Sequence, residues 1–315
     1  MPSRSDHFDG EKFFNPWGAN NTKTLWDVLK WKLSGSATEW PANASAGTAI
    51  PVLVDQGKAA SIHITAIGHA TTYIQDENIS VLTDPQFSER ASPVTFAGPR
   101  RHQKPAVTIE QLPAVDYVVV SHNHYDHMDL PSLKALYERF HPQFIVPLGN
   151  AKFLRDEGIE GITELDWWQS LGPVQLVPAQ HWSARGVGDR NLALWGGFVL
   201  TMSGRKVYFA GDTGYGPHFK MIKDRVGDIE LSLLPIGAYE PRSFMKDQHM
   251  NPEDAVKAHL DLNCKKSFAI HFEVFQLTDE GFDEPRKALR EELQKANLSA
   301  DAFFLPKLGE TLILK

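Results

Sequence analysis

The sequence predicts an α/β protein in which short buried strands end at residues of metal-binding type. Residues 117–120 form a β-branched apolar run typical of a buried strand, and this run leads into His-x-His-x-Asp-His at 122–127. Three more apolar runs stop at His181, at Asp212 and at His271. Because α/β proteins place their chemistry at strand ends, we predict that these four positions share one edge of the structure.

The chain from residue 61 onward fits a succession of strands with helices between them. Asn251 is predicted to cap a helix, with Pro252 at its first position and the acids Glu253 and Asp254 in its first turn. Another helix is expected over 132–140. The expected strands are 61–67, 71–74, 79–82, 117–120, 143–146, 174–177, 194–202, 206–210, 231–234 and 267–270.

Two parts of the chain are distinguished by composition. Residues 1–50 are expected to form an N-terminal extension of irregular chain with aromatic anchors such as Phe13 and Trp17, and residues 51–315 a single main domain. Within that domain, 90–104 is a Pro- and Gly-rich loop, predicted either to be solvated or to contact a phosphate or lipid headgroup. Its basic side chains are Arg90, Arg100, Arg101, His102 and Lys104.

The extension includes one predicted helix, over residues 25–33, for which Thr24 is the expected cap. Its apolar positions lie near helical spacing and it also carries Trp26 and Trp31. One interpretation is a helix that packs on the main domain. The other is a helix that touches a membrane surface, because tryptophan next to Lys30 suits an interface.

Composition limits the compartment and the partners. The net charge of −7 over 315 residues argues against nucleic acid as a partner, because duplex binding needs a basic face. Cys264 is the single cysteine, so an internal disulfide and thiolate metal sites are excluded. The sequence holds no apolar run of 18 residues and no apolar core of a signal peptide near Met1, so a cytoplasmic location is expected.

The strand ends together supply a set of candidate metal ligands. The set is His122, His124, Asp126, His127, His181, Asp212 and His271. One divalent ion takes three or four protein ligands and an open position, so seven ligands suit two ions that share a bridging carboxylate. Imidazole with carboxylate favours zinc, with manganese or iron as alternatives. His69, in a turn between two expected strands, is interpreted as a structural residue or a contact of a ligand, with direct binding of a metal ion as the alternative.

The cluster, followed by His181, Gly211-Asp212-Thr213 and His271, resembles the metallo-β-lactamase superfamily. Further motifs resemble the N-acylphosphatidylethanolamine-hydrolysing phospholipase D family, over most of the chain from about Phe13. These motifs are Gly-His-Ala-Thr at 68–71, Ser-Glu-Arg-Ala-Ser-Pro at 88–93, Leu-Asp-Trp-Trp at 165–168, Gly-Asp-Thr-Gly-Tyr at 211–215 and Pro-Ile-Gly-Ala-Tyr-Glu-Pro-Arg at 235–242.

The resemblance implies a four-layer αβ/βα sandwich and a division of the ligands. It assigns His122, His124 and His181 to one ion, Asp126, His127 and His271 to the other, and Asp212 to the bridge. It also points to His249 as a histidine of the active site that binds no metal. His249, Asp126 and Asp212 are therefore the residues expected at the reacting centre.

The implied activity is metal-dependent hydrolysis of N-acyl ethanolamine phospholipids or related lipids. Two ions about 3.5–4 Å apart can lower the pKa of a bridging water enough to supply hydroxide at neutral pH. Such an enzyme would contact a membrane surface transiently. A soluble phosphodiester or a sugar-phosphate lactone is the alternative substrate, and a non-enzymatic metal-bound or membrane-binding protein is a third interpretation. Glu273-Val274 and residues 94–96 depart from the family pattern, and either stretch could reshape the substrate pocket.

Overall fold

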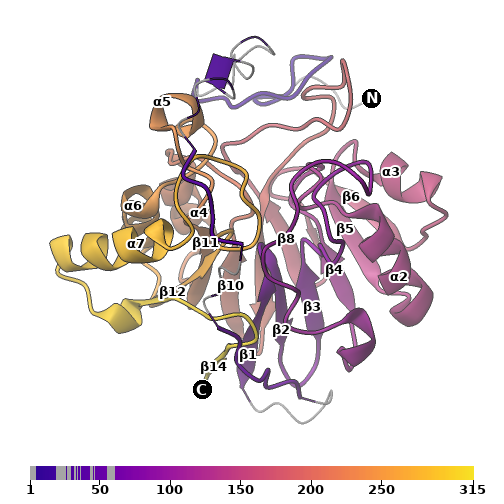
Figure 1. Cartoon of the computed structure of the whole chain (residues 1–315). Helices are drawn as coiled ribbons and strands as arrows, with labels where there is room; N and C mark the ends of the chain where they lie inside the picture. The colour runs from indigo at the N-terminus through magenta and orange to yellow at the C-terminus, as the bar shows by residue number, and fades with distance from the viewer. Residues whose placement is uncertain are drawn as a thin grey trace.

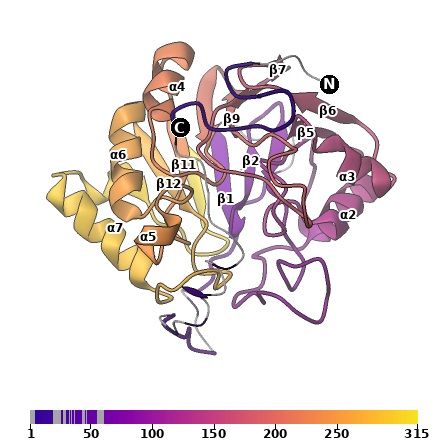
Figure 2. The ribbon, with the colours of Figure 1, turned by 90° about the horizontal axis from the view of Figure 1, so that it is seen from above.

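The computed structural model describes residues 5–18, 26, 30–31, 33, 35, 37–42, 45, 47–54 and 61–315. Two seven-stranded sheets lie face to face at its centre, and helices cover the outer face of each (Figures 1 and 2). The expected four-layer αβ/βα architecture is therefore confirmed.

The first sheet is antiparallel on one side of β3 and parallel on the other. Its strands, in spatial order, are β14 (Thr311–Leu314), β1 (Ile62–Gly68), β2 (Thr71–Gln75), β3 (Ser80–Thr83), β4 (Tyr117–Val119), β5 (Gln143–Pro147) and β6 (Ile162–Leu165). Hairpin-length connections join β1 to β2 and β2 to β3, whereas the parallel strands β4, β5 and β6 are linked through helices.

The second sheet is mixed in the same way. Its strands, in spatial order, are β13 (Phe303–Phe304), β12 (Lys266–Ile270), β11 (Leu231–Pro235), β10 (Arg205–Phe209), β9 (Gly197–Met202), β8 (Val174–Val177) and β7 (Ser170–Leu171). β10 to β13 pair in parallel, and β8 and β10 are both antiparallel to β9. As a result β8, β10, β11 and β12 all run in one direction, and their C-terminal ends lie along one edge.

Helices on both outer faces complete the sandwich. α2 (Leu130–Phe140) and α3 (Ala151–Asp156) cover the first sheet, and α4 (His218–Val226), α6 (Pro252–Leu262) and α7 (Glu284–Lys295) cover the second (Figure 1). The short helix α5 (Arg242–Met245) lies near the strand ends, and two 3₁₀ turns occupy Ile109–Gln111 and Ala300–Ala302. The predicted cap of α6 is confirmed, because the Asn251 side chain accepts a hydrogen bond from the Asp254 amide at 2.9 Å.

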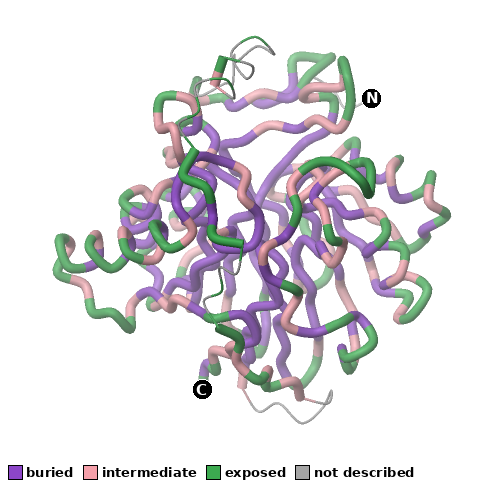
Figure 3. Tube along the Cα trace, viewed as in Figure 1, coloured by how far each residue is buried: buried purple, intermediate pink, exposed green. Residues whose placement is uncertain are grey.

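Alternation along the strands explains why both faces of each sheet are buried. In β4, Val119 faces the core between the two sheets, while its neighbour Val118 packs in the cluster that includes residues of α2 and α3. In β10, Phe209 faces the same central core and Tyr208 faces the cluster of α4, α6 and α7. Figure 3 shows the result as a buried centre with exposed helix surfaces and loops around it.

The sequence prediction was wrong at the start of one strand. Residues 194–196 were expected in the strand that the structure begins at Gly197. Leu194 instead donates its amide hydrogen to Leu148 O, and Gly196 donates to Ser121 O, so both lie outside the ladder with β10. The strands β6, β7, β13 and β14 and the helices α3, α4, α5 and α7 were not predicted, because each is short or largely polar along its exposed face.

The N-terminal extension packs on the domain at the anchors that the sequence indicates. Phe13 is buried, and Trp17 stacks on Trp167 and on His218 at ring-centroid distances of 5.9 and 5.5 Å. Trp26 and Trp31 are helical, as are Lys30 and Leu33. The predicted cap and the remaining positions of that helix, Thr24, Leu25, 27–29 and Lys32, lie outside the described residues. Among the described residues no helix is long and apolar enough to cross a membrane.

Candidate metal centre

The structure brings all seven predicted ligands to one edge of the sandwich. The segment after β4 supplies His122 to His127, and the chain just after β8, β10 and β12 supplies His181, Asp212 and His271. Gly211, directly before Asp212, has φ +61°, and a Cβ there would lie 2.5 Å from the Ser121 Cβ. Glycine is therefore needed where the two sheets approach at the site.

The first group consists of three imidazoles that face one another. His124 Nδ1 lies 2.8 Å from His122 Nε2 and 3.3 Å from His181 Nε2. His181 donates from Nδ1 to the Gln248 carbonyl at 2.9 Å, which leaves the lone pair of Nε2 directed at this centre. Three histidine nitrogens that converge in this way are typical of a zinc site with three histidine ligands.

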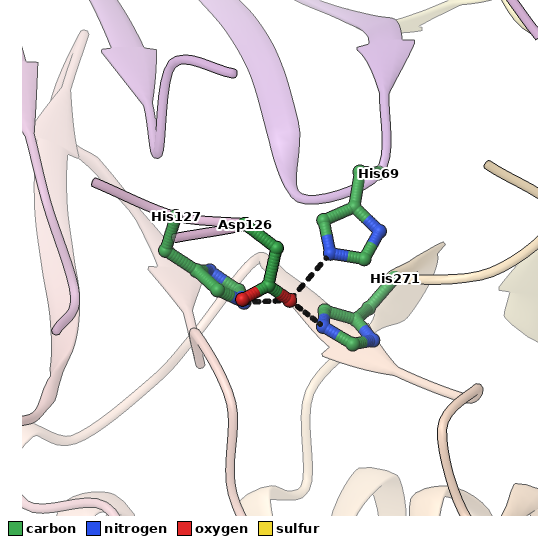
Figure 4. A group of neighbouring side chains, drawn as sticks. All are labelled: His69, Asp126, His127 and His271. Carbon is green, nitrogen blue, oxygen red and sulfur yellow. Dashed lines mark hydrogen bonds and ion pairs between the residues drawn. The ribbon is translucent and has the colours of Figure 1, made fainter. Parts of the chain in front are cut away.

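The second group surrounds the Asp126 carboxylate, as Figure 4 shows. Asp126 Oδ2 lies 3.3 Å from both His127 Nε2 and His271 Nε2. His69 lies next to His271, and its Nε2 is 3.0 Å from the same oxygen. His69 therefore contacts a candidate ligand, which is one of the interpretations that the sequence suggested.

Asp212 lies between the two groups. Its Oδ2 is 3.1 Å from His127 Nε2, and its Oδ1 is 3.1 Å from His271 Nε2. The same Oδ2 is 4.0 Å from His122 Nε2 and 3.9 Å from His181 Nε2. This is the position that a carboxylate shared by two cations would need.

The negative charges of Asp126 and Asp212 raise the pKa values of the two histidines that lie against them. Burial lowers the pKa of His271, but the negative charges of the nearby Asp212 and Asp126 outweigh burial and raise the pKa to about 9. Burial and the negative charges of Asp212 and Asp126 have the same opposed effects on His127, whose pKa is raised well above its ordinary value. A positive charge is therefore favoured between Asp126 and Asp212.

The first group behaves in the opposite way. Burial and the neighbouring imidazoles hold the pKa values of His122 and His124 well below their ordinary value. Burial lowers the pKa of His181 to about 4, although Asp212 opposes the shift. These three imidazoles are neutral at neutral pH, which is the state that binds a metal ion.

A cation also fits the buried polar atoms that lack hydrogen bonds. Nε2 of His127, Nε2 of His271 and Oδ1 of Asp212 are buried and have no hydrogen-bond partner in the described part of the chain. Buried polar atoms are otherwise almost always paired, so three such atoms within one cluster need another explanation. A divalent ion would satisfy them.

Asp84 is a residue of the site that the sequence prediction missed. Its Oδ2 accepts hydrogen bonds from His127 Nδ1 and from the Ser121 hydroxyl, both at 2.6 Å, and Ser121 in turn lies 2.9 Å from His122 Nδ1. One buried carboxylate thereby orients an imidazole in each group. Its position directly after β3, in Thr83-Asp84-Pro85, carried the same strand-end signal as the other sites.

Arg185 was also missed. Its Nη1 donates to the carbonyls of Asn123 and Met128 at 2.9 and 2.8 Å, and its guanidinium lies 4.2 Å from the Tyr125 ring centroid. Arg185 therefore holds the ends of the segment that carries four of the seven candidate ligands. No local pattern in the sequence indicated it, because it lies in a loop without a recognisable motif.

His249, expected near the centre without binding metal, lies beside it. Its Nδ1 is 3.8 Å from Asp212 Oδ2, and its side chain is 14% exposed. Burial lowers the pKa of His249 to about 3 against the opposing charge of Asp212. The imidazole is therefore neutral at neutral pH. The backbone carbonyl of His249 accepts a hydrogen bond from Arg242 Nη1 at 2.8 Å.

A cavity of about 770 Å³ opens onto the cluster. We call the four lining residues that belong to the candidate centre the cavity floor, and five of the apolar lining residues the cavity wall. The floor is His124, Asp126, Asp212 and His249, and the wall is Trp31, Val187, Phe244, Met245 and Leu277. The cavity therefore combines an ionic centre with an apolar surface large enough for a substrate with a hydrocarbon part.

The fold and the clustered histidines and aspartates define a hydrolase of the metal-dependent class. A profile of the beta-lactamase superfamily domain matches residues 80–272. The isothiocyanate hydrolase from Delia radicum gut bacteria is similar in structure, with a TM-score of 0.63 at 25% identity, over 79% of this chain and 98% of that one.

Two curated relatives narrow the assignment. The chain is 35% identical to N-acyl-phosphatidylethanolamine-hydrolyzing phospholipase D 1 of Caenorhabditis elegans, over 96% of this chain and 91% of that protein. It is also 35% identical to the mitochondrial N-acyl-phosphatidylethanolamine-hydrolyzing phospholipase D of Saccharomyces cerevisiae, over 83% of this chain and 58% of that protein. The chain belongs to the beta-lactamase superfamily and, within it, to the family of these phospholipases.

Proposed function

We propose that this protein is a phosphodiesterase of phospholipase D type that hydrolyses N-acyl ethanolamine phospholipids. The observation that carries the proposal is the cavity, in which an apolar wall continues directly from the candidate metal centre. A lipid phosphodiester has the same two parts, an anionic phosphate and a hydrocarbon body. The names of the two curated relatives give the same substrate class.

The seven candidate ligands are proposed to hold two divalent ions, with zinc as the first choice. His122, His124 and His181 would hold one ion. Asp126, His127 and His271 would hold the other, and Asp212 would bind both. When bound, the ions would activate water and neutralise charge on the phosphoryl oxygens.

Residues around the ligands have positioning roles in this proposal. His69 donates a hydrogen bond to Asp126 and so fixes the carboxylate that faces His127 and His271. This role agrees with its burial, which lowers the pKa of His69 to about 3 and keeps the ring neutral. His249 is proposed as a neutral hydrogen-bond partner of the leaving group, since a pKa of about 3 leaves no imidazolium to donate at neutral pH.

A lipid substrate implies transient contact with a membrane, and three segments that line the cavity carry exposed apolar side chains. Val187 is fully exposed at the tip of its loop. Trp26 and Leu33 are 61% and 76% exposed in the segment of Trp31, and Phe96 is 82% exposed in the loop that begins near the cavity residue Ala91. We propose that these side chains contact the lipid surface.

The basic loop contributes less charge to docking than its composition suggests. Arg101 is buried and bonds to Gln86 and Ser88, and Arg100 pairs with Glu89 at 2.5 Å. With a net charge of −7 as well, docking should rest mainly on apolar contact, which salt does not weaken. Co-sedimentation with vesicles across a salt series should show weak binding, partly lost at high salt and reduced by Trp26→Ala with Leu33→Ala.

The substrate is tested with a panel of N-acyl phosphatidylethanolamine vesicles and soluble bis-aryl phosphodiesters. We expect release of the N-acylethanolamine from the vesicles and its loss when a chelator removes the metal. Elemental analysis of the active protein should give two divalent ions per chain. Full activity with one ion or none would contradict the two-ion site, and turnover of the soluble diesters alone, without vesicle binding, would contradict the lipid substrate.

A further inference from the structure

Trp31 is the one residue of the cavity wall that comes from the N-terminal extension. The other wall residues lie at Val187, at Phe244 and Met245 in α5, and at Leu277. The superfamily profile covers residues 80–272, so Trp31 lies outside the part of the chain that supplies the candidate ligands. Trp31 therefore lines the cavity although it is distant in sequence from the candidate ligands.

The indole of Trp31 is held in place by two contacts. Its Nε1 donates a hydrogen bond to Asp279 Oδ2 at 2.8 Å, and its ring lies 5.2 Å from the Phe244 ring by centroids. Asp279 is buried, so it is a firm anchor for the indole. An aromatic surface fixed in this way can contact an apolar ligand without losing further side-chain entropy.

The chain after Trp31 is joined to the same turn. Thr38 N donates to Asp279 O at 2.8 Å, Gln276 Nε2 donates to Thr38 O at 2.7 Å, and Trp40 Nε1 donates to Glu280 O at 2.8 Å. The turn itself is tied to the domain, because Glu280 accepts hydrogen bonds from the amides of Ala238 and Glu240. Trp31 is therefore placed by a hydrogen-bonded unit and not by its own helix alone.

Trp26 provides a contrast within the same helical segment. Trp26 is 61% exposed and is not part of the cavity, whereas Trp31 is half-buried and lines it. Two tryptophans of one segment thus face different surroundings.

We propose that Trp31 is a specificity-determining residue that contacts the aliphatic chain of the substrate. The proposal rests on the proposed function, since it assumes a ligand whose phosphate lies on the cavity floor. Affinity should then increase with the length of the chain that reaches the indole, because each buried methylene adds apolar contact.

The test measures binding and not turnover. Butyl, octyl and dodecyl phosphate, each below its micelle concentration, are titrated by calorimetry into the zinc-loaded protein. The unsubstituted protein should bind dodecyl phosphate much more tightly than butyl phosphate. Trp31→Ala should weaken the binding of dodecyl phosphate by about tenfold and that of butyl phosphate by less than about twofold. This difference is expected when apolar contact is lost far from the phosphate.

Two variants make the outcome specific. Trp26→Ala is the matched control and should retain the full dependence on chain length. Trp31→Phe loses the hydrogen bond to Asp279 but keeps an apolar ring, and it should recover most of the dependence even if Trp31→Ala folds poorly. The same dependence in Trp31→Ala as in the unsubstituted protein, or no dependence in either, would overturn the assignment. Because no lipid is hydrolysed, the result stands apart from the vesicle assay of the proposed function.

Discussion

The floor and the wall of the cavity are built by different means. Three of the floor residues come from segments at strand ends and His249 from the turn between α5 and α6, and all four are buried or half-buried. Short contacts to other charged groups fix Asp126 and Asp212. The wall residues come from the extension, a short helix and two loops, and Val187 is fully exposed. Changes in the floor should therefore affect the reaction with any substrate, whereas changes in the wall should affect which substrate binds.

The largest effect is expected from Asp212→Ala. This change removes the carboxylate between the two groups of histidines and would leave two cations facing each other. Turnover should fall by about a thousandfold or more, because bound ions contribute several kcal/mol to the transition state. His69→Ala removes one contact of Asp126 and should cost about 10- to 100-fold. Similar turnover and metal content in the two variants would refute the ligand assignment.

Asp84→Asn tests whether the floor depends on a residue that is not a ligand. Asp84 orients His127 directly and His122 through Ser121. Metal affinity should fall about 10- to 100-fold, as is typical when a partner of a ligand is altered. Competition with a chromophoric chelator measures this, and Asp116→Asn, a carboxylate that bonds Ser80 away from the centre, serves as the control. Unchanged affinity would show that the floor is fixed by its ligands alone.

Val187→Asp tests the wall without a cost in folding, since the side chain is exposed. Hydrolysis of vesicle lipid should fall about tenfold, because a charge replaces apolar surface that would contact the lipid. Turnover of a soluble diester should change by less than about threefold. Equal losses on both substrates would mean that floor and wall are not separable as described.

The smallest expected effect is a pH dependence of stability from His7. Its Nε2 lies 2.7 Å from Asp166 and its Nδ1 2.6 Å from Asp6, with the ring stacked on Trp167. Burial lowers the pKa of His7, but hydrogen bonds and charges of the two carboxylates reverse this and raise it above 6.5. The stabilisation is therefore complete below about pH 6.5 and is lost as pH rises through the raised pKa.

The measurement compares thermal unfolding of the unsubstituted protein and His7→Gln across this range. The difference in Tm should be about 2 °C at low pH and should shrink as pH rises, since Asp6 is largely exposed and contributes little. A difference that grows with pH would show that the neutral ring is the stabilising form.

The sequence by itself determined the set of candidate ligands and most strands of the sheets. Most strands can be recognised in the sequence as a run of apolar residues followed by a polar residue. The cluster at 122–127 is dense enough to be recognised without any other motif. The prediction failed at residues 194–196, where amide bonds to Leu148 and Ser121 decide the conformation. Those partners are distant in sequence and leave no local pattern.

Only the tertiary structure decided how the site is supported and what surrounds it. Asp84 and Arg185 act on the centre through contacts across 37 to 62 residues of sequence; Asp84 has a strand-end position but no local sign of its partners, and Arg185 belongs to no recognisable motif. The sequence alone does not distinguish Trp31 from Trp26, and only the contacts of Trp31 with Asp279 and Phe244 show which of the two lines the cavity. Strand ends can be predicted because they follow from the local pattern of apolar residues. The cavity wall cannot, because it depends on which loops, distant in sequence, pack against one another.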